Sequence, residues 1–452
     1  MKNYAEFDRK GCFSYKKIYA VTIPILLSML MEHIIGMTDT AFLGRVSEVA
    51  LGASALGTVY FLVFYVLGSG FSFGAQILIA RRNGERNFSK IGSICYASGF
   101  FLLLLSVILI IFIRCFSPSI LAEIIKSKDI CDSTIQYMNY RAYGLFFAFG
   151  AAIFRAFYVG IARTKILTYT SIAMVGSNFV LNYALIFGKF GLPAMGIAGA
   201  ATASSISEAI SLLCYIVYSL KVVDVVKYGF HCLKAFCKIS ILKKVFAVSF
   251  WMMLQPFLSV GIWFLFFLAV EHLGERSLAV INLARSLSAL PFMVIHACAT
   301  AANSLTGNLI GAEKVDQVWR LIGKISLACT AIVLPMLIIF SIFPQETLRI
   351  YTDNHELIKA SVNVVYVMNI ASFFQIFAFI LFNVVSGTGA VKTTVVIETV
   401  NLALYVFFVW LIIIRMRSTP AVAWTVEIIY QLTASIICFA YLFTGRWKNK
   451  KL

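Results

Sequence analysis

Long apolar segments constrain the fold of this chain more than any other feature. Phe100–Ile113, for example, reads FFLLLLSVILIIFI. It lies in a segment long enough to cross a bilayer, which takes about 20 mainly apolar residues. Charged residues make up 13% of the chain, against about 25% in a soluble domain. Alternating strands of about ten residues, typical of membrane β-barrels, are absent from the sequence. We therefore predict a polytopic helical membrane protein.

Twelve such segments predict twelve transmembrane helices. We place them near residues 18–43, 51–79, 92–113, 134–158, 166–188, 195–220, 245–271, 277–305, 321–343, 358–387, 392–414 and 419–443. The first apolar segment is longer than that of a signal peptide, and no small-residue cleavage site follows it. We expect it to remain as the first span.

Lysine and arginine are divided unevenly between alternate connections of these helices. One side holds 25 of them and the other side 10. Because basic residues favour the cytoplasmic side of a membrane, we expect the richer side, with both termini, to be cytoplasmic. This orientation accounts for most of the net charge of +18, so we expect no nucleic-acid partner. The pattern favours a bacterial inner (plasma) membrane.

The second half of the chain repeats features of the first half. AQILIARRNGERN follows the second predicted span and ANSLTGNLIGAEK follows the eighth, which aligns Gly84 with Gly311. A weaker match after the fourth and tenth spans aligns Gly160 with Gly387. Both pairs are 227 positions apart, so the chain is predicted to contain two repeated six-helix bundles.

The repeat defines the predicted domains. They are a cytoplasmic segment 1–17, an N-terminal bundle 18–220, a basic cytoplasmic linker 221–244, a C-terminal bundle 245–443 and a cytoplasmic tail 444–452. Parallel repeats are a common transporter architecture, and they favour alternating access over a channel.

Several other classes of protein lack support in the sequence. The ten cysteines include no CxxC pair and are interpreted as small buried hydrophobic residues. The chain has no G-x-x-x-x-G-K-[ST] motif, so ATP is not expected to drive it. The dispersed residues His231, His272, His296 and His355 form no catalytic motif of a membrane enzyme such as an acyltransferase. We expect neither an enzymatic activity nor a cofactor.

The first span carries an unusual polar face within MLMEHIIGMTDTAFLG, Met29–Gly44. Glu32 and Asp39 are seven positions apart, so they share a helix face with Gly36 between them. A charge at mid-membrane costs about 2.5–3.5 kcal/mol, so this face must meet a cavity or a partner. His33 points about 100° away from Glu32, and we expect it to form a structural hydrogen bond to a neighbouring helix.

Four segments carry a resemblance to a known family. They are TDTAFLG (Thr38–Gly44), SNFVLNYALIFG (Ser177–Gly188), GIAGAATAS (Gly196–Ser204) and TGNLIGA (Thr306–Ala312). In this order and spacing they resemble the multidrug and toxic compound extrusion (MATE) family, and the likeness runs from about residue 18 to 443. Asn308 stands where the family usually has Gln.

The resemblance implies a fold and a function. The fold would be twelve helices in two bundles around a central cleft, in a monomer surrounded by the lipid bilayer. The function would be export of cationic, amphipathic small molecules by a secondary active antiporter. The coupling ion would be Na⁺ or H⁺, with no other cofactor.

The resemblance also assigns a coupling site in the N-terminal half. The family motif falls on Asp39, which favours a cation or proton site there over a satisfied acid near the outer interface. Glu32 lies deeper, and a buried carboxylate in apolar surroundings can carry a proton at neutral pH. A structural hydrogen bond is the alternative for Glu32.

Two amides of the fifth span are expected to join this site. Asn178 and Asn182 are four positions apart and share a face, and their oxygens suit a hard cation such as Na⁺. Asp39, Asn178 and Asn182 are the predicted Na⁺ ligands, completed by Thr202 or Ser204 from the sixth span. Hydrogen bonds between helices are the alternative role for the two amides. Some family members have Asp at the position of Asn182, so this chain has one titratable group fewer there.

The C-terminal half departs further from the family. Gln255 and Ser259 lie near the position of a family Glu in the seventh span, and Gln375 stands for an Asp in the tenth. Neither glutamine titrates, so we expect ion coupling in the N-terminal half. Gln255, Ser259 and Gln375 are instead candidates for hydrogen-bonding the substrate or lining its cleft.

The remaining acids of the spans are candidates for the substrate cleft. They are Glu208, Glu398 and Glu427, and Trp424 lies near Glu427. An aromatic ring beside a carboxylate can receive an organic cation, with paired structural acids as the alternative. Arg155 and Arg285 are expected to pair with these acids or to snorkel.

The main rival function is a flippase for lipid-linked oligosaccharide or peptidoglycan precursors, from a related superfamily. Such a protein would need a basic cleft for pyrophosphate. Few arginines or lysines fall within the spans and several acids do, which favours the exporter.

Overall fold

The computed structural model describes residues 11–230 and 239–448, and these residues are mostly helical. Eleven of the described helices are long and apolar enough to cross a membrane, and a bent helix pair makes a twelfth span. This confirms the predicted fold class. Parts of the predicted terminal segments (1–10 and 449–452) and of the predicted linker (231–238) lie outside the described residues.

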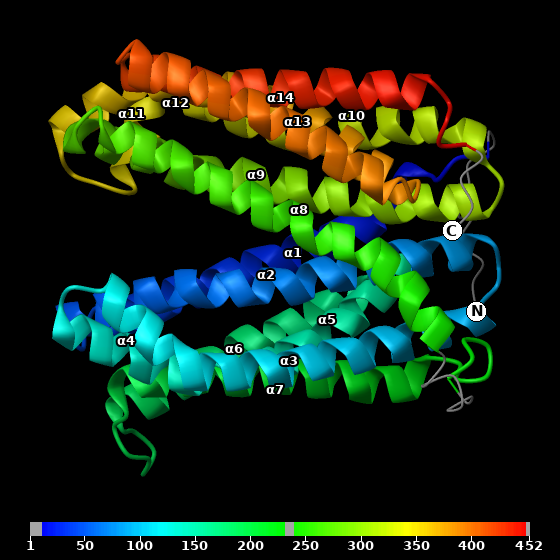
Figure 1. Cartoon of the computed structure of the whole chain (residues 1–452), viewed down its shortest axis with the longest axis horizontal. Coiled ribbons are helices and arrows are strands. Elements are labelled where there is room, and N and C mark those ends of the chain that lie inside the picture. The colour runs from blue at the N-terminus through cyan, green and yellow to red at the C-terminus, as the bar shows by residue number, and fades with distance from the viewer. Residues whose placement is uncertain (1–10, 231–238, 449–452) are drawn as a thin grey trace. The chain divides into compact units, whose positions relative to one another are not determined.

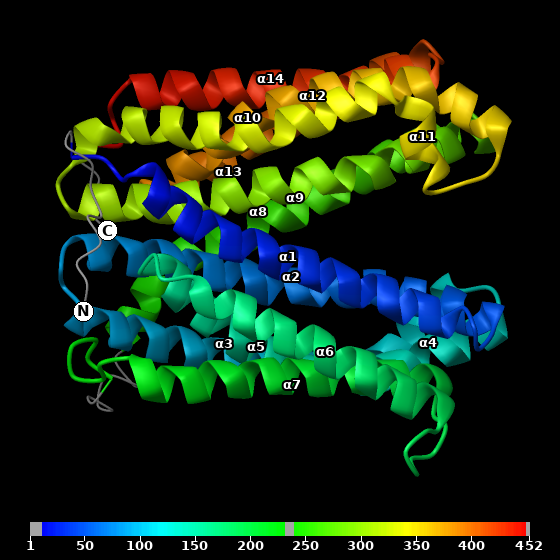
Figure 2. The same cartoon turned by 180° about the vertical axis from the view of Figure 1, so that it is seen from behind.

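The N-terminal unit contains residues 23–253 and seven complete or partial helices before α8 (Figure 1). They are α1 (Tyr15–Leu43), α2 (Glu48–Gly84), α3 (Ser89–Ile124), α4 (Lys128–Arg141), α5 (Gly144–Gly160), α6 (Lys165–Phe187) and α7 (Gly196–Val222). Within this unit α6 packs along α7, and α2 packs against α4 and α5. Figure 2 shows α6 and α7 side by side.

The C-terminal unit contains residues 254–452 together with residues 1–22. Its helices are α8 (Ile239–Glu271), α9 (Glu275–Gly311), η2 (Val315–Gln317), α10 (Val318–Ile342), α11 (Pro344–Arg349), α12 (His355–Gly387), α13 (Val391–Val409), η3 (Trp410–Arg415) and α14 (Pro420–Phe443). Its helix α12 packs against α9, α10 and α14 (Figure 1).

The division between the units passes through α1 and α8, the first helix of each half. The first half of α8 packs on α2 at two glycines: a Cβ on Gly70 would lie 2.5 Å from the Met252 carbonyl oxygen, and one on Gly74 would lie 2.4 Å from Ser249 Oγ. Only residues without a side chain permit this approach. The predicted bundles divide between helices, at 220 and 245, whereas these compact units divide inside them.

The repeat is visible in the helix boundaries. Helix α2 spans 48–84 and α9 spans 275–311, so both ends are 227 positions apart. The start of α4 at 128 and the end of α5 at 160 correspond in the same way to α12, 355–387. The offset that aligned two pairs of glycines therefore relates whole helices.

Local signals explain several helix ends. Ser47 Oγ accepts a hydrogen bond from the Ala50 backbone at 3.0 Å and caps α2. Asn354 Oδ1 accepts one from Leu357 at 3.1 Å and caps α12. Gly188 ends α6 with φ +67°, a conformation that glycine adopts without strain.

The fourth predicted span is broken, which the sequence did not indicate. Helices α4 and α5 meet at an angle of 47° on either side of residues 142–143. A Cβ on Gly144 would lie 2.2 Å from Arg141 Nη1 and 2.4 Å from Glu208 Oε2. The absence of a side chain at Gly144 therefore leaves room for a buried charge pair beside the break, whereas the corresponding helix α12 is continuous.

Candidate functional site

A cavity of about 540 Å³ lies within the N-terminal unit. Its wall carries three acids and two arginines: Glu32, Asp39, Glu208, Arg141 and Arg155. Helices α1, α4, α5 and α7 contribute these side chains. The polar face predicted for the first span therefore meets a cavity.

Asp39 belongs to a closed ring of hydrogen bonds with α6 and α7. Asn182 Nδ2 donates to Asp39 Oδ1 at 2.6 Å and to Asn178 Oδ1 at 3.0 Å. Asn178 Nδ2 donates to Ser204 Oγ at 3.3 Å, and Ser204 Oγ donates to Asp39 Oδ2 at 3.1 Å. The structure thus brings together four residues of the predicted site.

The ring contains no charged partner for Asp39 and leaves one acceptor unused. Asn178 and Asn182 are 1% and 0% exposed. Asn182 Oδ1 is buried without a hydrogen-bond partner among the described residues. A buried acceptor without a partner costs about 1–3 kcal/mol, so this oxygen is suited to receive a cation or a water. The oxygens of Asp39, Asn178 and Asn182 fit the preference of Na⁺ for oxygen ligands.

Thr202 does not join the ring. Its hydroxyl donates to the Ala198 carbonyl oxygen on its own helix at 2.8 Å. The described α7 residues that line the cavity are Ser204, Ser207, Glu208, Ser211 and Tyr215. Of the two predicted hydroxyls, that of Ser204 contacts Asp39 and that of Thr202 does not.

Glu32 is paired with Arg155 through an ion pair between α1 and α5. Arg155 Nη2 also donates to Ser28 Oγ at 3.3 Å. The side chains of Arg155 and Glu32 are 36% and 35% exposed. Arg155 pairs with an acid, as expected, although the acid is Glu32. Glu32 therefore has a fixed partner of opposite charge, whereas the sequence suggested apolar surroundings.

Glu208 is paired with Arg141 on α4. The two nitrogens of Arg141 reach the two carboxylate oxygens at 2.6 and 2.9 Å, a bidentate geometry. Glu208 was a candidate for the substrate cleft, and it lines the cavity of the N-terminal unit. Arg141 was not identified from the sequence, although a charge inside a span generally needs a partner of opposite sign.

Other predicted pairings are not seen. Arg285 Nε donates to Asn282 Oδ1 at 3.0 Å, an exposed contact on its own helix, and forms no ion pair with an acid among the described residues. His33 is exposed on α1 and forms no hydrogen bond to the described helices. The guanidinium of Arg285 lies over the rings of Trp263 and Phe267, 5.8 Å from each ring centroid, and the exposure of His33 explains its missing hydrogen bond.

Three polar candidates of the C-terminal half come together inside that unit. Ser259 Oγ donates to Glu398 Oε1 at 2.5 Å, and Gln255 Nε2 lies 3.5 Å from Ser259 Oγ. Tyr430 donates to the same carboxylate oxygen, Glu398 Oε1, at 2.9 Å. This cluster joins α8, α13 and α14.

Among the described residues, the remaining candidates form no hydrogen bond to Gln255, Ser259 or Glu398, although Glu427 adjoins the cluster through Tyr405, whose ring centroid lies 5.4 Å from that of Tyr430. Glu427 accepts a hydrogen bond from the Tyr405 hydroxyl at 2.7 Å. Trp424 is buried in the core, with its ring centroid 6.0 Å from that of Phe266. Gln375 is half-buried on α12. Burial of Trp424 removes the exposed aromatic surface that a bound organic cation would need.

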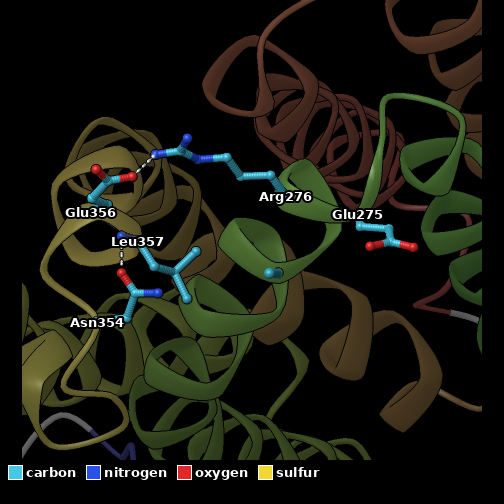
Figure 3. Close-up of a pocket in the computed structure, with 6 residues that line it drawn as sticks. Glu275, Arg276, Asn354, Glu356 and Leu357 are labelled. Carbon is cyan, nitrogen blue, oxygen red and sulfur yellow. Dashed lines mark hydrogen bonds and ion pairs between the residues drawn. The ribbon is translucent and has the colours of Figure 1, made fainter.

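A second hollow lies where α9 and α12 begin (Figure 3). Arg276 Nη2 lies 3.4 Å from Glu356 Oε2 across it, and the two side chains are 68% and 83% exposed. Exposed pairs of this kind contribute about 0–1 kcal/mol. We do not assign a site to this hollow.

Comparisons with known proteins agree with the fold. A sequence model of the MatE family matches residues 24–184 and 252–411, one segment in each half. The probable multidrug resistance protein NorM of Thermotoga maritima is 25% identical, over 96% of this chain and 93% of that protein. The protein of the same name from Burkholderia mallei is 28% identical over 64% of this chain and 61% of that protein.

Solved structures show the same fold. A MOP superfamily transporter from Pyrococcus furiosus superposes with a TM-score of 0.87 at 19% identity, covering 96% of this chain and 97% of that one. The eukaryotic MATE transporter AtDTX14 gives a TM-score of 0.78 at 17% identity, covering 96% of both chains. The family match covers more than half of the residues of this chain, so the chain belongs to the MatE family.

Proposed function

We propose that this membrane protein is a secondary active multidrug exporter. It exchanges cationic or amphipathic small molecules for Na⁺ or H⁺ by alternating access. It performs no chemical reaction on its substrate and works as a monomer. The names of its relatives, probable multidrug resistance proteins, support export of drugs, and we assign the protein to a bacterial inner membrane. Both termini are assigned to the cytoplasm by the distribution of lysine and arginine.

The ring around Asp39 is the observation that carries this proposal. Glu32 and Glu208 have arginine partners, whereas all the hydrogen-bond donors of Asp39 are neutral. A carboxylate without a fixed counter-charge is free to exchange a proton or a small cation. Asp39 therefore serves as the coupling group, with Asn178, Asn182 and Ser204 as its partners.

Ion exchange supplies sufficient free energy for export. Concentrating a neutral compound a hundredfold costs about 2.8 kcal/mol. One positive charge that moves inward through about 100 mV releases about 2.3 kcal/mol. For a monovalent cationic substrate the electrical contributions of a one-for-one exchange cancel. The chemical gradient of the ion, or a second ion, must then provide the difference.

Efflux of a fluorescent organic cation from proteoliposomes tests the proposal. Na⁺ and pH gradients are imposed separately on wild type, Asp39→Asn and the exposed control Asp353→Asn. We expect gradient-driven efflux in wild type and in the control, and its loss in Asp39→Asn. The gradient that drives efflux identifies the ion. Full efflux in Asp39→Asn would show that coupling lies elsewhere.

The alternative is translocation of a lipid-linked precursor. Arg141 and Arg155 line the cavity, which would suit a pyrophosphate group, but each is neutralised by a glutamate. The pairing favours the exporter. The flippase would be favoured if neither gradient drives efflux and the protein translocates a labelled lipid pyrophosphate.

A further inference from the structure

Each unit contains a polar contact between its first and fifth spans. In the N-terminal unit this contact joins α1 to α6, where Ser28 Oγ lies 2.8 Å from Ser171 Oγ. Glu32 follows Ser28 by one helical turn and brings a carboxylate to the same place. In the C-terminal unit the contact joins α8 to α13 through Ser259 and Glu398.

The repeat relates these two contacts residue by residue. At the offset of 227, Glu32 corresponds to Ser259 and Ser171 corresponds to Glu398. The N-terminal unit therefore places its carboxylate on the first span, and the C-terminal unit places it on the fifth. Each unit therefore has one carboxylate at the contact between its first and fifth spans.

The two carboxylates differ in whether a positively charged side chain neutralises them. Glu32 is paired with Arg155, and the residue 227 positions after Arg155 is Phe382, which carries no charge. Glu398 is only 4% exposed. No described lysine or arginine forms an ion pair with it; its partners are the hydroxyls of Ser259 and Tyr430 and the amide of Gln255. A buried carboxylate whose hydrogen-bond partners are all neutral is costlier to ionise than one paired with an arginine, so it becomes neutral more readily.

The surroundings of Glu398 supply no compensating cation. Helix α8 faces it with Gln255 and Ser259, which do not titrate. Helix α14 faces it with the titratable groups Tyr430 and Cys438, both neutral at pH 7 in their ordinary forms, and carries an acid, Glu427, next to Tyr430. Helix α12, which packs against α13, carries no charged residue from 360 to its end at 387.

The hydrogen bonds also indicate where a proton would sit. Ser259 and Tyr430 both donate to Oε1 of Glu398, at 2.5 and 2.9 Å. Neither hydroxyl donates to Oε2. A proton on Oε2 is compatible with both bonds and removes the buried charge.

We propose that Glu398 is a proton-binding site of the C-terminal unit, and that it takes up and releases one proton in each transport cycle. The uptake and release of this proton during transport rests on the proposed function. The proton is held on Oε2, and its release leaves a carboxylate that keeps the hydroxyls of Ser259 and Tyr430 as donors. Coupling would then involve Asp39 in one unit and Glu398 in the other.

Infrared spectroscopy of the purified full chain tests the proton site without transport. We expect wild type at pH 7 to show the carbonyl stretch of a protonated carboxyl that is missing in Glu398→Gln. The exposed Glu356→Gln serves as the matched control and should keep that band. Identical carboxyl bands in wild type and Glu398→Gln would overturn the proposal, because Glu398 would then be ionised.

Proton counting tests the use of the site in transport. Protons moved per molecule of a fluorescent organic cation are compared in proteoliposomes of wild type, Glu398→Gln and Glu398→Asp. We expect Glu398→Gln to move one proton fewer and Glu398→Asp to match wild type, which also shows that loss is not due to misfolding. Equal proton counts in wild type and Glu398→Gln would overturn this role.

The two measurements separate this inference from the proposed function. If wild type transports no organic cation under either gradient, the proposed function fails and the infrared band alone decides whether Glu398 holds a proton. If wild type transports but the band is absent, the exporter stands and the Glu398 site fails.

Discussion

At the residue scale, the sequence predicted the side chains that meet around Asp39, but not all of the partners of the other candidates. Asp39, Asn178 and Asn182 were predictable because a polar residue inside an apolar helix must face other polar groups. The choice between Thr202 and Ser204 was not predictable, because two small hydroxyls on one helix differ only in their rotation toward α1. Arg141 was missed because it lies near the end of the helix before the α4–α5 break, and the sequence predicts no break there.

The choice between these two hydroxyls gives a matched test. Ser204→Ala removes a donor to Asp39, whereas Thr202→Ala removes a bond to the backbone of its own helix. A hydrogen bond to a charged group contributes about 1.5–3 kcal/mol, which corresponds to a change of roughly tenfold or more in ion affinity. We expect the half-saturating ion concentration for efflux to rise in Ser204→Ala and to stay near wild type in Thr202→Ala. Equal effects of the two variants would remove Ser204 from the site.

The buried pair of Arg141 and Glu208 makes a different prediction, about stability. Their side chains are 13% and 15% exposed, so Arg141→Met leaves Glu208 as a buried charge without its partner. Breaking such a pair costs about 3–5 kcal/mol, while replacing both members with apolar groups is often neutral. We expect Arg141→Met to lower the thermal unfolding temperature in detergent and the double variant Arg141→Met/Glu208→Leu to recover most of it. A double variant no more stable than the single one would mean that the pair does more than neutralise charge.

At the element scale, the number and order of the spans were predictable and their shapes were not. Apolar length determines where a helix can cross a bilayer, and the twelve predicted segments correspond to the observed spans. The bend between α4 and α5 depends on a contact with α7, which is far away in the sequence. A pattern of local hydropathy contains no information about such a contact.

The bend can be tested at the glycine that permits it. A Cβ at Gly144 would come within 2.4 Å of Glu208 Oε2, whereas one at Gly99 on α3 would meet no atom within 4 Å. We expect Gly144→Ala to displace the Arg141–Glu208 pair and to lower the unfolding temperature. Gly99→Ala should be neutral or stabilising by up to about 1 kcal/mol, because alanine favours a helix. Similar unfolding temperatures for the two variants would show that the pair adapts without cost.

At the scale of the whole molecule, two weak glycine alignments predicted a repeat that relates complete helices. The repeat preserves backbone positions more strictly than side-chain chemistry, because packing depends on helix length and close approach. A charged residue can therefore move from one helix of a contact to the other. In the N-terminal unit the carboxylate is Glu32 on the first span and the serine is Ser171 on the fifth, whereas in the C-terminal unit the serine is Ser259 on the first span and the carboxylate is Glu398 on the fifth. Sequence reasoning compared single positions of the C-terminal half with the family and so did not detect this exchange.

The exchange leads to a prediction about a double variant. Ser259 and Glu398 are in contact at 2.5 Å, so the variant Ser259→Glu/Glu398→Ser moves the carboxylate to the helix that carries it in the N-terminal unit, with little change in its location. If location determines proton binding, this double variant should move as many protons per substrate as wild type, while Glu398→Ser alone moves one fewer. Proton counting in proteoliposomes distinguishes these results. A double variant that behaves like Glu398→Ser would mean that the hydroxyl donors, and not the position in the repeat, make the site.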